Sequence, residues 1–313
     1  MKSWKVLFIG VGSIAKRHIK NLTHFMKQRN EKLSIDVYRS GHGHLLPEEV
    51  RPFVLHVYYD QKEVPEDYDV IFVTNPTQFH LQAIQCFHTK GKHFFIEKPL
   101  CAAGQLNALD IAWRPDSIYY VAAPLRYSSV LQYVKVHIKP QEVLSVRCIS
   151  SSYLPDWRPG IDYRQTYSAH KELGGGVSID LIHEWDYITF LFGFPVRTEC
   201  LIRKLSDLEI DSDDIAVYIA DFGHMLAEVH VDYIGQSPVR TMEIITKDEV
   251  IACDLLKSSI LYKKSGRMIS FGQKRDEYQI DEIRYFWSLI DGQIYGTEHI
   301  EHACKVLRIA GGL

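Results

Sequence analysis

Hydrophobic and polar residues follow two different patterns along this chain. Over the first 125 residues, unbroken apolar runs such as 6–10, 69–74 and 93–97 alternate with segments whose apolar residues recur at helical spacing, such as 13–27 and 78–90. Continuous apolar strands separated by helices are typical of a parallel sheet covered on both faces. The pattern therefore predicts a doubly wound α/β fold for this part of the chain.

Beyond about residue 140, apolar and polar residues alternate with the period of two that half-buried strands show. This pattern covers 143–153, 197–204, 214–222, 225–233, 240–246 and 250–255. One long segment, 176–192, has helical periodicity instead, and a final helix is expected at 298–309. We expect an α+β second domain with an open, mostly antiparallel sheet. The predicted division is 1–125 and 126–313, with the final helix able to return to the first domain.

Composition narrows the class of protein. Of the 313 residues, 36 are Lys or Arg and 39 are Asp or Glu, which gives a formal net charge of -3 and argues against a nucleic-acid-binding surface. No apolar run approaches the ~18 residues of a membrane span, and the first residues lack the long apolar stretch of a signal peptide. The six cysteines form no CxxC pair, which indicates buried thiols in a reducing cytoplasm rather than disulfides or a metal site.

A glycine-rich turn joins the first predicted strand to the first predicted helix. Its residues include Gly10, Gly12, Ser13, Ile14 and Ala15, in the order Gly-Val-Gly-Ser-Ile-Ala. In a GxGxxG/A fingerprint the first glycine makes the tight turn, the second lets the backbone approach a pyrophosphate, and the small last residue allows close helix packing. The phosphates bind at the helix N-terminus. We expect a dinucleotide site here; the alternative is a strand-to-helix turn without a ligand.

The end of the second predicted strand distinguishes NAD(H) from NADP(H). An NAD site usually places Asp or Glu there, about 20 residues beyond the glycines, to accept a hydrogen bond from the ribose 2′-hydroxyl. Here Arg39 and Ser40 occupy the end and suit a 2′-phosphate, whereas Asp36 lies earlier in the strand. The residues favour NADP(H), with NAD(H) as the alternative.

Polar residues also follow two later strands of the first domain. Asn75 and Pro76 follow one of them, with His80 shortly afterwards, and Glu97 and Lys98 end the next. Open α/β sheets bind ligands at the carboxyl ends of their strands. Lys98 can there hydrogen-bond a substrate hydroxyl and help to move its proton, while Glu97 orients Lys98 or contacts the cofactor. The alternative is a surface lysine at a strand end.

Three motifs resemble those of the Gfo/Idh/MocA family, named after glucose-fructose oxidoreductase, inositol dehydrogenase and rhizopine catabolism proteins. They are the glycine fingerprint followed by His18, the Asn-Pro step followed by His80, and Glu97-Lys98-Pro99, which is the most specific of the three. The resemblance covers essentially the whole chain. It implies a Rossmann domain whose Asn-Pro-His and Glu-Lys-Pro residues lie near the cofactor. It also implies a homodimer or homotetramer that uses the C-terminal sheet, and hydride transfer between nicotinamide and a sugar or cyclitol carbon.

The segment 176–192 carries a polar stripe on an otherwise apolar helix. Its members, spaced i, i+3, i+4 and i+7, are Asp180, His183, Glu184 and Tyr187, and this spacing predicts that they share one face. Such a stripe is costly unless it lines a wet cavity. We favour His183 as the proton shuttle, because imidazole titrates near neutral pH. Asp180 is expected to position the substrate or His183, and Glu184 is the alternative acid or base.

This segment departs from the family pattern GGGxLxDxGxHxxD by one residue. His183 follows Asp180 by three positions instead of four, and Glu184 occupies the usual histidine position. If the trailing HxxD is aligned instead, His183 and Asp186 fit. The form Asp-Leu-x-His-Glu-x-Asp-Tyr resembles a subgroup of the family, and the identity of the proton shuttle therefore stays open between His183 and Glu184.

A turn-rich loop of polar and aromatic residues, 153–168, precedes this segment and strengthens the resemblance to family members of bacterial surface-sugar pathways. Its arginines and tyrosines suit a carboxylate or phosphate on the substrate; the alternative is an ordered surface loop. An Arg-Tyr step at 126–127 matches an Arg-Phe/Tyr step that lies near the substrate in the family. The candidate substrate contacts are Arg126, Tyr127, Trp157, Arg158, Tyr163 and Arg164.

Together these residues predict an NAD(P)-dependent dehydrogenase or reductase. Its expected substrate is a secondary alcohol or ketone of a sugar, sugar acid or nucleotide sugar. Two alternatives stay open: an NAD-dependent glycoside hydrolase of the same family, which oxidises its substrate transiently, and a nucleotide-binding regulator without chemistry. Retention of both the Glu-Lys-Pro motif and the polar stripe disfavours the regulator.

Overall fold

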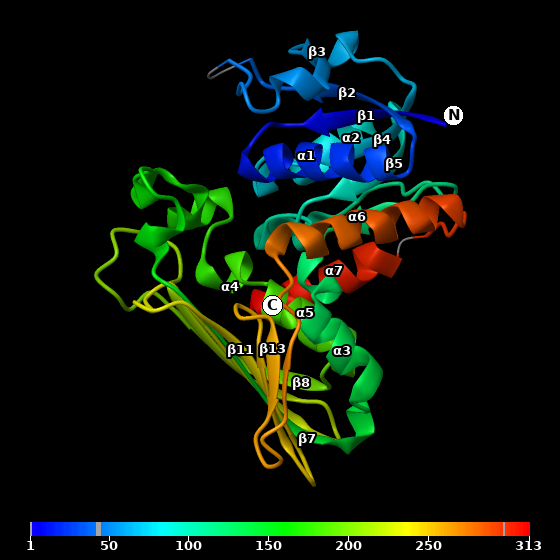
Figure 1. Cartoon of the computed structure of the whole chain (residues 1–313). Coiled ribbons are helices and arrows are strands. Elements are labelled where there is room, and N and C mark those ends of the chain that lie inside the picture. Colours follow the sequence, from blue (N-terminus) through cyan, green and yellow to red (C-terminus); the bar gives the residue numbers. More distant parts are fainter. Residues whose placement is uncertain (1, 42–44, 297) are drawn as a thin grey trace. The chain divides into compact units, whose positions relative to one another are not determined.

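The computed structural model describes residues 2–41, 45–296 and 298–313 of the chain. It divides into two compact units. The first combines Met1–Ala122 with Gln279–Cys304, and the second combines Ala123–Tyr278 with Lys305–Leu313. The first unit is therefore assembled from segments far apart in the sequence. It includes the blue strands of Figure 1 and most of the orange helix.

The first unit is built on a six-stranded parallel sheet in the order β3-β2-β1-β4-β5-β6. The strands are β1 (Ser3–Ile9), β2 (Lys32–Tyr38), β3 (Val54–Tyr58), β4 (Tyr68–Val73), β5 (Gly91–Ile96) and β6 (Tyr119–Val121). The strand order reverses beside β1, and such sheets bind ligands at this switch, next to the carboxyl ends of the strands. The predicted doubly wound fold is confirmed.

Helices cover both faces of this sheet. They are α1 (Ser13–Gln28), α2 (His80–Phe87), α6 (Arg275–Asp291) and the first part of α7 (Glu298–Ala310). On one face, α1 and α6 share an apolar core in which the Trp287 ring lies 5.6 Å from the Trp4 ring and 5.9 Å from the Phe25 ring. On the other face, α2 and α7 cover a core that contains Ile84 and Ile300. Burial on both faces explains the unbroken apolar runs of the strands.

Helix α6 is absent from the elements predicted above. Its buried side begins with two polar residues, Gln279 and Glu282, which interrupt the apolar stripe that Ile283, Phe286 and Trp287 continue. The Tyr120 hydroxyl donates to Glu282 Oε1 over 3.1 Å, so a hydrogen bond from β6 compensates part of the cost of burying this carboxylate. A partner so distant in sequence leaves no local signal.

The second unit is built on an eight-stranded sheet in the order β14-β13-β12-β11-β7-β10-β9-β8. The strands are β7 (Val143–Ser151), β8 (Arg197–Arg203), β9 (Ile215–Asp221), β10 (Leu226–Asp232), β11 (Val239–Thr246), β12 (Val250–Asp254), β13 (Ser259–Tyr262) and β14 (Met268–Ser270). β7 and β10 are parallel, and the other neighbouring strands named here are antiparallel. The predicted open, mostly antiparallel sheet is confirmed.

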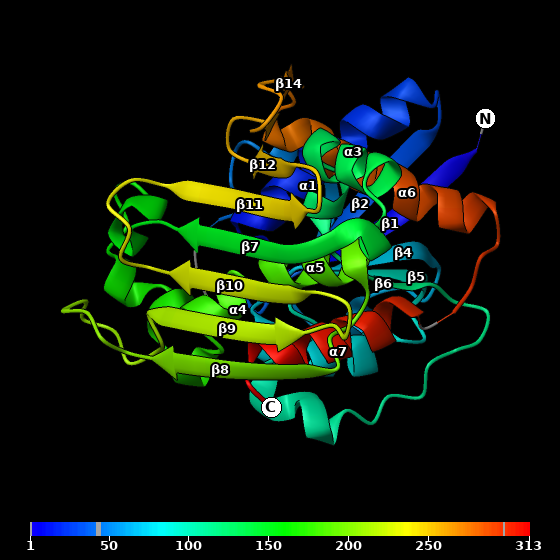
Figure 2. The same cartoon turned by 90° about the horizontal axis from the view of Figure 1, so that it is seen from below.

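Helices pack on one side of this second sheet. They are α3 (Ser129–His137), which is also absent from the predicted elements, α4 (Val177–Asp180) and α5 (His183–Phe192). The Trp185 ring of α5 meets the Tyr218 ring of β9 edge to face at 5.3 Å, and the Tyr218 hydroxyl donates to the Ala310 carbonyl over 2.6 Å. Figure 2 looks onto the opposite, outer face of the strands. Within the described residues, no helix has the length and apolar character needed to cross a membrane.

Short 3-10 turns occur in the connections of both units. They are η1 (Arg51–Phe53), η2 (Gln61–Glu63), η3 (Thr77–Phe79), η4 (Ala103–Ala108), η5 (Pro124–Tyr127), η6 (Pro140–Glu142), η7 (Leu154–Trp157), η8 (Tyr163–Gln165), η9 (Tyr167–Ala169) and η10 (Lys171–Leu173). Four of them, η7 to η10, lie between β7 and α4, so the polar loop predicted at 153–168 is a series of tight turns.

The prediction of one continuous helix at 176–192 is wrong, because α4 and α5 are separate. At the junction the Ile182 N–H bonds to the Ile179 carbonyl at 3.3 Å and the Glu184 N–H to the Leu181 carbonyl at 3.4 Å. These bonds span three residues instead of four, and a 3-10 turn rotates the chain further per residue than an α-helix does. Residues before and after the junction therefore do not keep the helical phase on which the predicted stripe depends.

Candidate active site

The glycine-rich turn holds the carboxyl ends of β1, β2 and β4 together. Gly10 has a φ of 83°, and a Cβ at this position would lie 2.9 Å from the Asn75 Cα. The Gly10 N–H donates to the Tyr38 carbonyl over 2.9 Å, and Thr74 Oγ1 donates to the Gly10 carbonyl over 3.1 Å. A left-handed backbone in so tight a space requires glycine. Gly10 therefore makes the tight turn that the fingerprint predicts.

The N-terminus of α1 is open. Gly12 is the N-cap, and within the described residues no side chain caps this end and no acidic residue occupies the first turn. A Cβ on Gly12 would meet no described atom within 4 Å. The first N–H groups of a helix, here at Ser13, Ile14 and Ala15, have no acceptor inside the helix and carry partial positive charge. This end of α1 offers both the donors and the room that a phosphate group needs.

Two buried polar atoms beside this turn, Asn75 Oδ1 and Arg39 Nη1, lack a hydrogen-bond partner among the described residues. Buried polar atoms without partners are rare because they cost free energy. Arg39 follows β2, and its N–H donates to the Tyr58 carbonyl over 3.0 Å, which fixes the backbone there. Together with the open end of α1, these atoms fit a nicotinamide dinucleotide.

Asp36 is engaged inside the sheet. Its carboxylate accepts a hydrogen bond from the Tyr68 hydroxyl over 2.7 Å and one from the His56 N–H over 3.1 Å. The residue is 1% exposed. The alternative acidic residue for a ribose hydroxyl is therefore occupied by contacts between strands, while Arg39 and exposed Ser40 stand at the strand end.

The Glu97-Lys98-Pro99 turn is anchored to α1 by a buried pair. His18 Nε2 lies 2.5 Å from Glu97 Oε1, and the other carboxylate oxygen accepts the Lys98 N–H over 3.3 Å. His18 packs against the rings of Phe72 and Phe95. Burial alone would raise the pKa of Glu97, but the hydrogen bond from His18 and the charges of His18 and Lys98 bring it below its ordinary value. Glu97 is thus an ionised anchor for the backbone of Lys98.

His80 connects the two strand ends from the other side. Its Nε2 lies 2.9 Å from the Asn75 carbonyl and its Nδ1 lies 3.0 Å from the Pro99 carbonyl. The side chain is 1% exposed, and burial lowers its pKa. The predicted cofactor residue His80 therefore contacts two loops of the protein, one through the Asn75 carbonyl and one through the Pro99 carbonyl.

In the second unit, Asp180 lies between tyrosine hydroxyls. The Tyr233 hydroxyl donates to Asp180 Oδ2 over 2.6 Å. Burial and the charge of the nearby Asp180 carboxylate raise the pKa of Tyr167. Asp213 Oδ2 accepts the Ser178 N–H over 2.9 Å and so caps α4. Asp180 is held rigidly at the end of a helix of one turn.

His183 and Asp186 lie on the partly exposed side of α5. Asp186 receives a two-pronged contact from Arg126, with Nε at 2.8 Å and Nη2 at 2.5 Å from its oxygens. Tyr127 belongs to the same turn, η5, and is partly exposed. The two residues of the HxxD alignment, His183 and Asp186, thus share one face of α5. Arg126 contacts this face through Asp186.

Glu184 points away from that face, toward the sheet. It is fully buried, and its Oε1 lies 2.9 Å from Arg240 Nε on β11. Burial raises the pKa of Glu184 although the Arg240 charge opposes this. The predicted common face of Asp180, His183 and Glu184 is wrong, because the junction changes the helical phase and a charge from β11, rather than a wet cavity, compensates the buried carboxylate.

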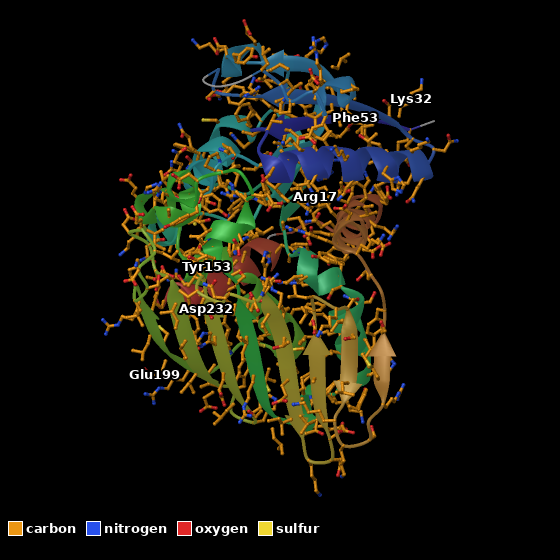
Figure 3. All side chains as sticks on the ribbon, turned by 60° about the vertical axis from the view of Figure 1, so that its left-hand side comes forward. Arg17, Lys32, Phe53, Tyr153, Glu199 and Asp232 are labelled. Atoms are coloured by element: carbon orange, nitrogen blue, oxygen red, sulfur yellow. The ribbon has the colours of Figure 1, made fainter. Side chains whose placement is uncertain are left out.

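The loop of tight turns starts where β7 and β10 end at the same edge of the sheet, near the labelled Tyr153 and Asp232 in Figure 3. Trp157 Nε1 donates to Ser152 Oγ over 2.9 Å. Tyr163 accepts the Glu209 N–H at its hydroxyl over 3.2 Å. The turns thus hold Trp157 and Tyr163, two of the predicted substrate contacts, in fixed positions.

Two residues at these sites, Tyr233 and Arg240, lie outside the motifs singled out in the sequence. Tyr233 holds Asp180 but carries no local signal. Arg240 does carry a signal, because it lies two residues before Met242 and four before Ile244 along β11, and both of these side chains are buried on the inner face of the sheet. A charged residue at an inward position of a strand indicates a buried partner.

Comparison with known proteins identifies the first unit. Residues 4–114 match the family model described as an oxidoreductase family with an NAD-binding Rossmann fold. The matched range contains all three motifs singled out in the sequence. Residues 4–114 therefore match the NAD-binding domain of the Gfo/Idh/MocA oxidoreductase family. The resemblance inferred from the sequence is confirmed, although no curated protein sequence matches the chain.

Solved structures share the fold of both units of this chain. A levoglucosan dehydrogenase in complex with NADH has a TM-score of 0.85 at 17% identity, covering 99% of this chain and 95% of that chain. UDP-N-acetylglucosamine 3-dehydrogenase from Acidithiobacillus ferrooxidans has a TM-score of 0.79 at 17% identity, covering 100% and 97%. Myo-inositol 2-dehydrogenase from Lactobacillus plantarum has a TM-score of 0.77 at 19% identity, covering 99% and 96%.

The buried pair of His18 and Glu97 predicts a pH-dependent contribution to stability. Replacing Glu97→Gln removes a charged partner from a buried contact and is expected to lower the free energy of unfolding at neutral pH by about 1–3 kcal/mol. Because the pKa of Glu97 is lowered in the folded state, this difference is complete above its ordinary value of 4.5 and shrinks as the pH falls below it.

Denaturant unfolding of wild type and Glu97→Gln across this pH range measures the difference. The control is Glu63→Gln, an exposed carboxylate of the same unit, for which no difference is expected at any pH. A difference between wild type and Glu97→Gln that stays constant on acidification would contradict the role given to the Glu97 charge.

Proposed function

We propose that this protein is a nicotinamide-dependent dehydrogenase or reductase that acts on a secondary alcohol or ketone of a sugar, sugar acid or nucleotide-linked sugar. The observation that carries the proposal is the anchored turn in which Glu97 and His80 hold the backbone around Lys98 at the carboxyl end of β5. The Gfo/Idh/MocA domain and the sugar and cyclitol dehydrogenases of the same fold support it.

The cofactor is proposed to be NADP(H) rather than NAD(H). Arg39, whose Nη1 has no partner within the described residues, and Ser40 would contact the 2′-phosphate. The residues that would hold the rest of the cofactor are Gly10, Gly12, Ser13, Ile14, Ala15, Asn75 and Pro76. His80 and Glu97 would act on it through the loops that they hold.

When bound, the nicotinamide supplies a hydride acceptor or donor for the substrate carbon. Lys98 would hydrogen-bond the oxygen on that carbon and move its proton. Glu97 contributes by fixing the Lys98 backbone, because a small misplacement of such a group lowers the rate strongly. The restraint from His18 and His80 keeps the turn in one arrangement.

On the substrate side, His183 is proposed as the proton shuttle and Asp180 as the group that orients the substrate. His183 lies on the partly exposed side of α5, whereas Glu184 lies beneath the sheet against Arg240, which favours His183 over Glu184. The proposed substrate contacts are Arg126, Tyr127, Trp157, Arg158, Tyr163 and Arg164.

The outer face of the eight-stranded sheet is proposed to join copies of the chain into a homodimer or homotetramer in the cytoplasm. Exposed apolar residues on this face are Ile149, Leu201, Val217, Ile219 and Leu226. Among them Arg147 lies 3.3 Å from Glu228 and 3.7 Å from Glu243. Exposed apolar residues interspersed with paired charges are typical of a subunit interface, and the free thiols fit a reducing compartment.

Turnover tests the chemistry. Lys98→Met is expected to lower kcat by roughly a hundred- to ten-thousandfold, as loss of a general acid or base does, while leaving the cofactor affinity unchanged. The control is Lys92→Met, at the exposed start of the same strand. Absorbance of the reduced nicotinamide follows the reaction on the sugar that gives the highest rate, and an unchanged kcat in Lys98→Met would reject the assignment.

The same assay separates the two enzyme alternatives. A dehydrogenase consumes or produces reduced nicotinamide in step with product, whereas the hydrolase of this family returns its cofactor to the starting state. Cleavage of a glycoside without net change in nicotinamide absorbance would therefore replace the proposal by the hydrolase.

Titration of both nucleotides tests the cofactor preference. Arg39→Ala is expected to weaken NADPH binding roughly ten- to a hundredfold, because charge-assisted contacts to a phosphate are lost, and to leave NADH binding nearly unchanged. Arg51→Ala, an exposed arginine of the same unit, serves as the control. Tighter binding of NADH by wild type, with no effect of Arg39→Ala, would reverse the preference.

Sedimentation tests the proposed interface. Ile219 lies between Glu199, labelled in Figure 3, and Glu228 in the strand register, so Ile219→Asp brings three carboxylates together on the outer face. It is expected to convert a dimer or tetramer into smaller species. Leu256→Asp, at an exposed turn after β12, is the control. A monomeric wild type would exclude the interface.

A further inference from the structure

The three arginines proposed to contact substrate differ in whether a carboxylate of the protein already pairs with them. Arg126 is occupied by Asp186. Arg164 is occupied by Asp162 at 2.8 Å and by Glu209 at 3.2 Å. Arg158 forms no ion pair with a carboxylate in the part of the chain that the structure describes. A carboxylate partner neutralises the charge that an anionic ligand would use, so Arg158 is the arginine of this set best able to bind one.

Arg158 is held in place by an aromatic ring. Its guanidinium lies over the ring of Tyr167, 5.3 Å from the ring centre. This contact orients the planar guanidinium without using its N–H groups, which point along the plane. The Tyr167 side chain also lies near the Asp180 carboxylate, whose charge raises the pKa of Tyr167. Arg158 is therefore tied, through one tyrosine, to the residue proposed to orient the substrate.

A second aromatic contact, between Trp157 and Tyr233, also connects the loop to Asp180. The Tyr233 hydroxyl donates to Asp180 at 2.6 Å, and the ring of Trp157 meets the ring of Tyr233 edge to face at 5.1 Å. Trp157 and Arg158 are neighbours in the chain, and together with Ile161 they surround the same narrow gap between side chains of the loop. An indole beside a guanidinium offers an apolar surface for a sugar ring and a cationic group for a substituent on it.

We infer that Arg158 binds a carboxylate or phosphate group on the substrate, so that the enzyme acts on an acidic or phosphorylated sugar and not on a neutral one. The inference rests on the proposed function and specifies its substrate class. A guanidinium binds both carboxylate and phosphate through two parallel N–H contacts. The Asp180 carboxylate, held by Tyr233, disfavours an anion at its own position and accepts hydrogen bonds from neutral hydroxyl groups.

Calorimetry on the full chain, with and without NADP+, tests the inference. The probes are glucose, galactose and N-acetylglucosamine, each as the free sugar, the uronate and the 1-phosphate. At least one charged form is expected to bind roughly tenfold or more tightly than its neutral parent. The uronates and the 1-phosphates then show which of the two anionic groups Arg158 binds.

Variants of the loop identify the residue responsible. Arg158→Gln is expected to weaken binding of the charged form roughly ten- to a hundredfold and to leave the neutral parent unaffected. Arg158→Lys, which keeps the charge but loses the planar fork, is expected to fall between the two. Lys171→Gln, an exposed cation in η10 of the same connection that is not among the proposed substrate contacts, is the control. Circular dichroism checks that each variant is folded. If Arg158→Gln does not fold, the comparison of wild type with Arg158→Lys serves as the test.

Equal affinities for neutral and charged sugars would overturn the inference. So would the failure of every charged probe to bind, or equal losses in Arg158→Gln and Lys171→Gln. A charged sugar that binds through Arg158 without being oxidised or reduced would contradict the proposed function alone. A neutral sugar turned over equally well by wild type and Arg158→Gln would contradict this inference alone.

Discussion

The buried contact between His18 and Glu97 fixes the position of the Lys98 turn relative to helix α1 in the first unit. A carboxylate inside a protein needs a partner, and Glu97 finds one on α1, the helix whose N-terminus is open for phosphate. The same contact ties β5 to α1 from the core side. The helix that would bind the cofactor and the turn that carries Lys98 are therefore held by one interaction, and neither can shift without the other.

The second unit also contains buried carboxylates that need partners, but the partners are of different kinds. Asp180 is stabilised by neutral hydroxyl groups, and Glu184 by the Arg240 charge, although both belong to one short stretch of sequence. Hydroxyl donors leave the net charge at Asp180 negative, whereas an arginine cancels it. One carboxylate thus keeps an electrostatic influence on its surroundings, and the other serves the packing of α5 on the sheet.

The sequence predicts what depends on neighbours in the chain and fails where partners are distant. The apolar runs, the Gly10 turn and the Glu97 motif follow from local spacing, and they lead correctly to the fold and to the family. The separation of α4 from α5 does not, because it depends on bonds that span three residues at Leu181 and Ile182. The role of Glu184 likewise depends on Arg240, far along the chain, and local periodicity assigns it to the wrong face.

The first unit is interrupted in the sequence, because Gln279–Cys304 completes what Met1–Ala122 begins. Trp287 fills the core between α1 and the sheet, so the ribosome must make Ala123–Tyr278 of the second unit before that core can close. At a synthesis rate of 5–20 residues per second, the unfinished half waits roughly 8–30 s with apolar surface uncovered. Protection of this surface during synthesis is consequently a requirement that the order of the chain imposes on the cell.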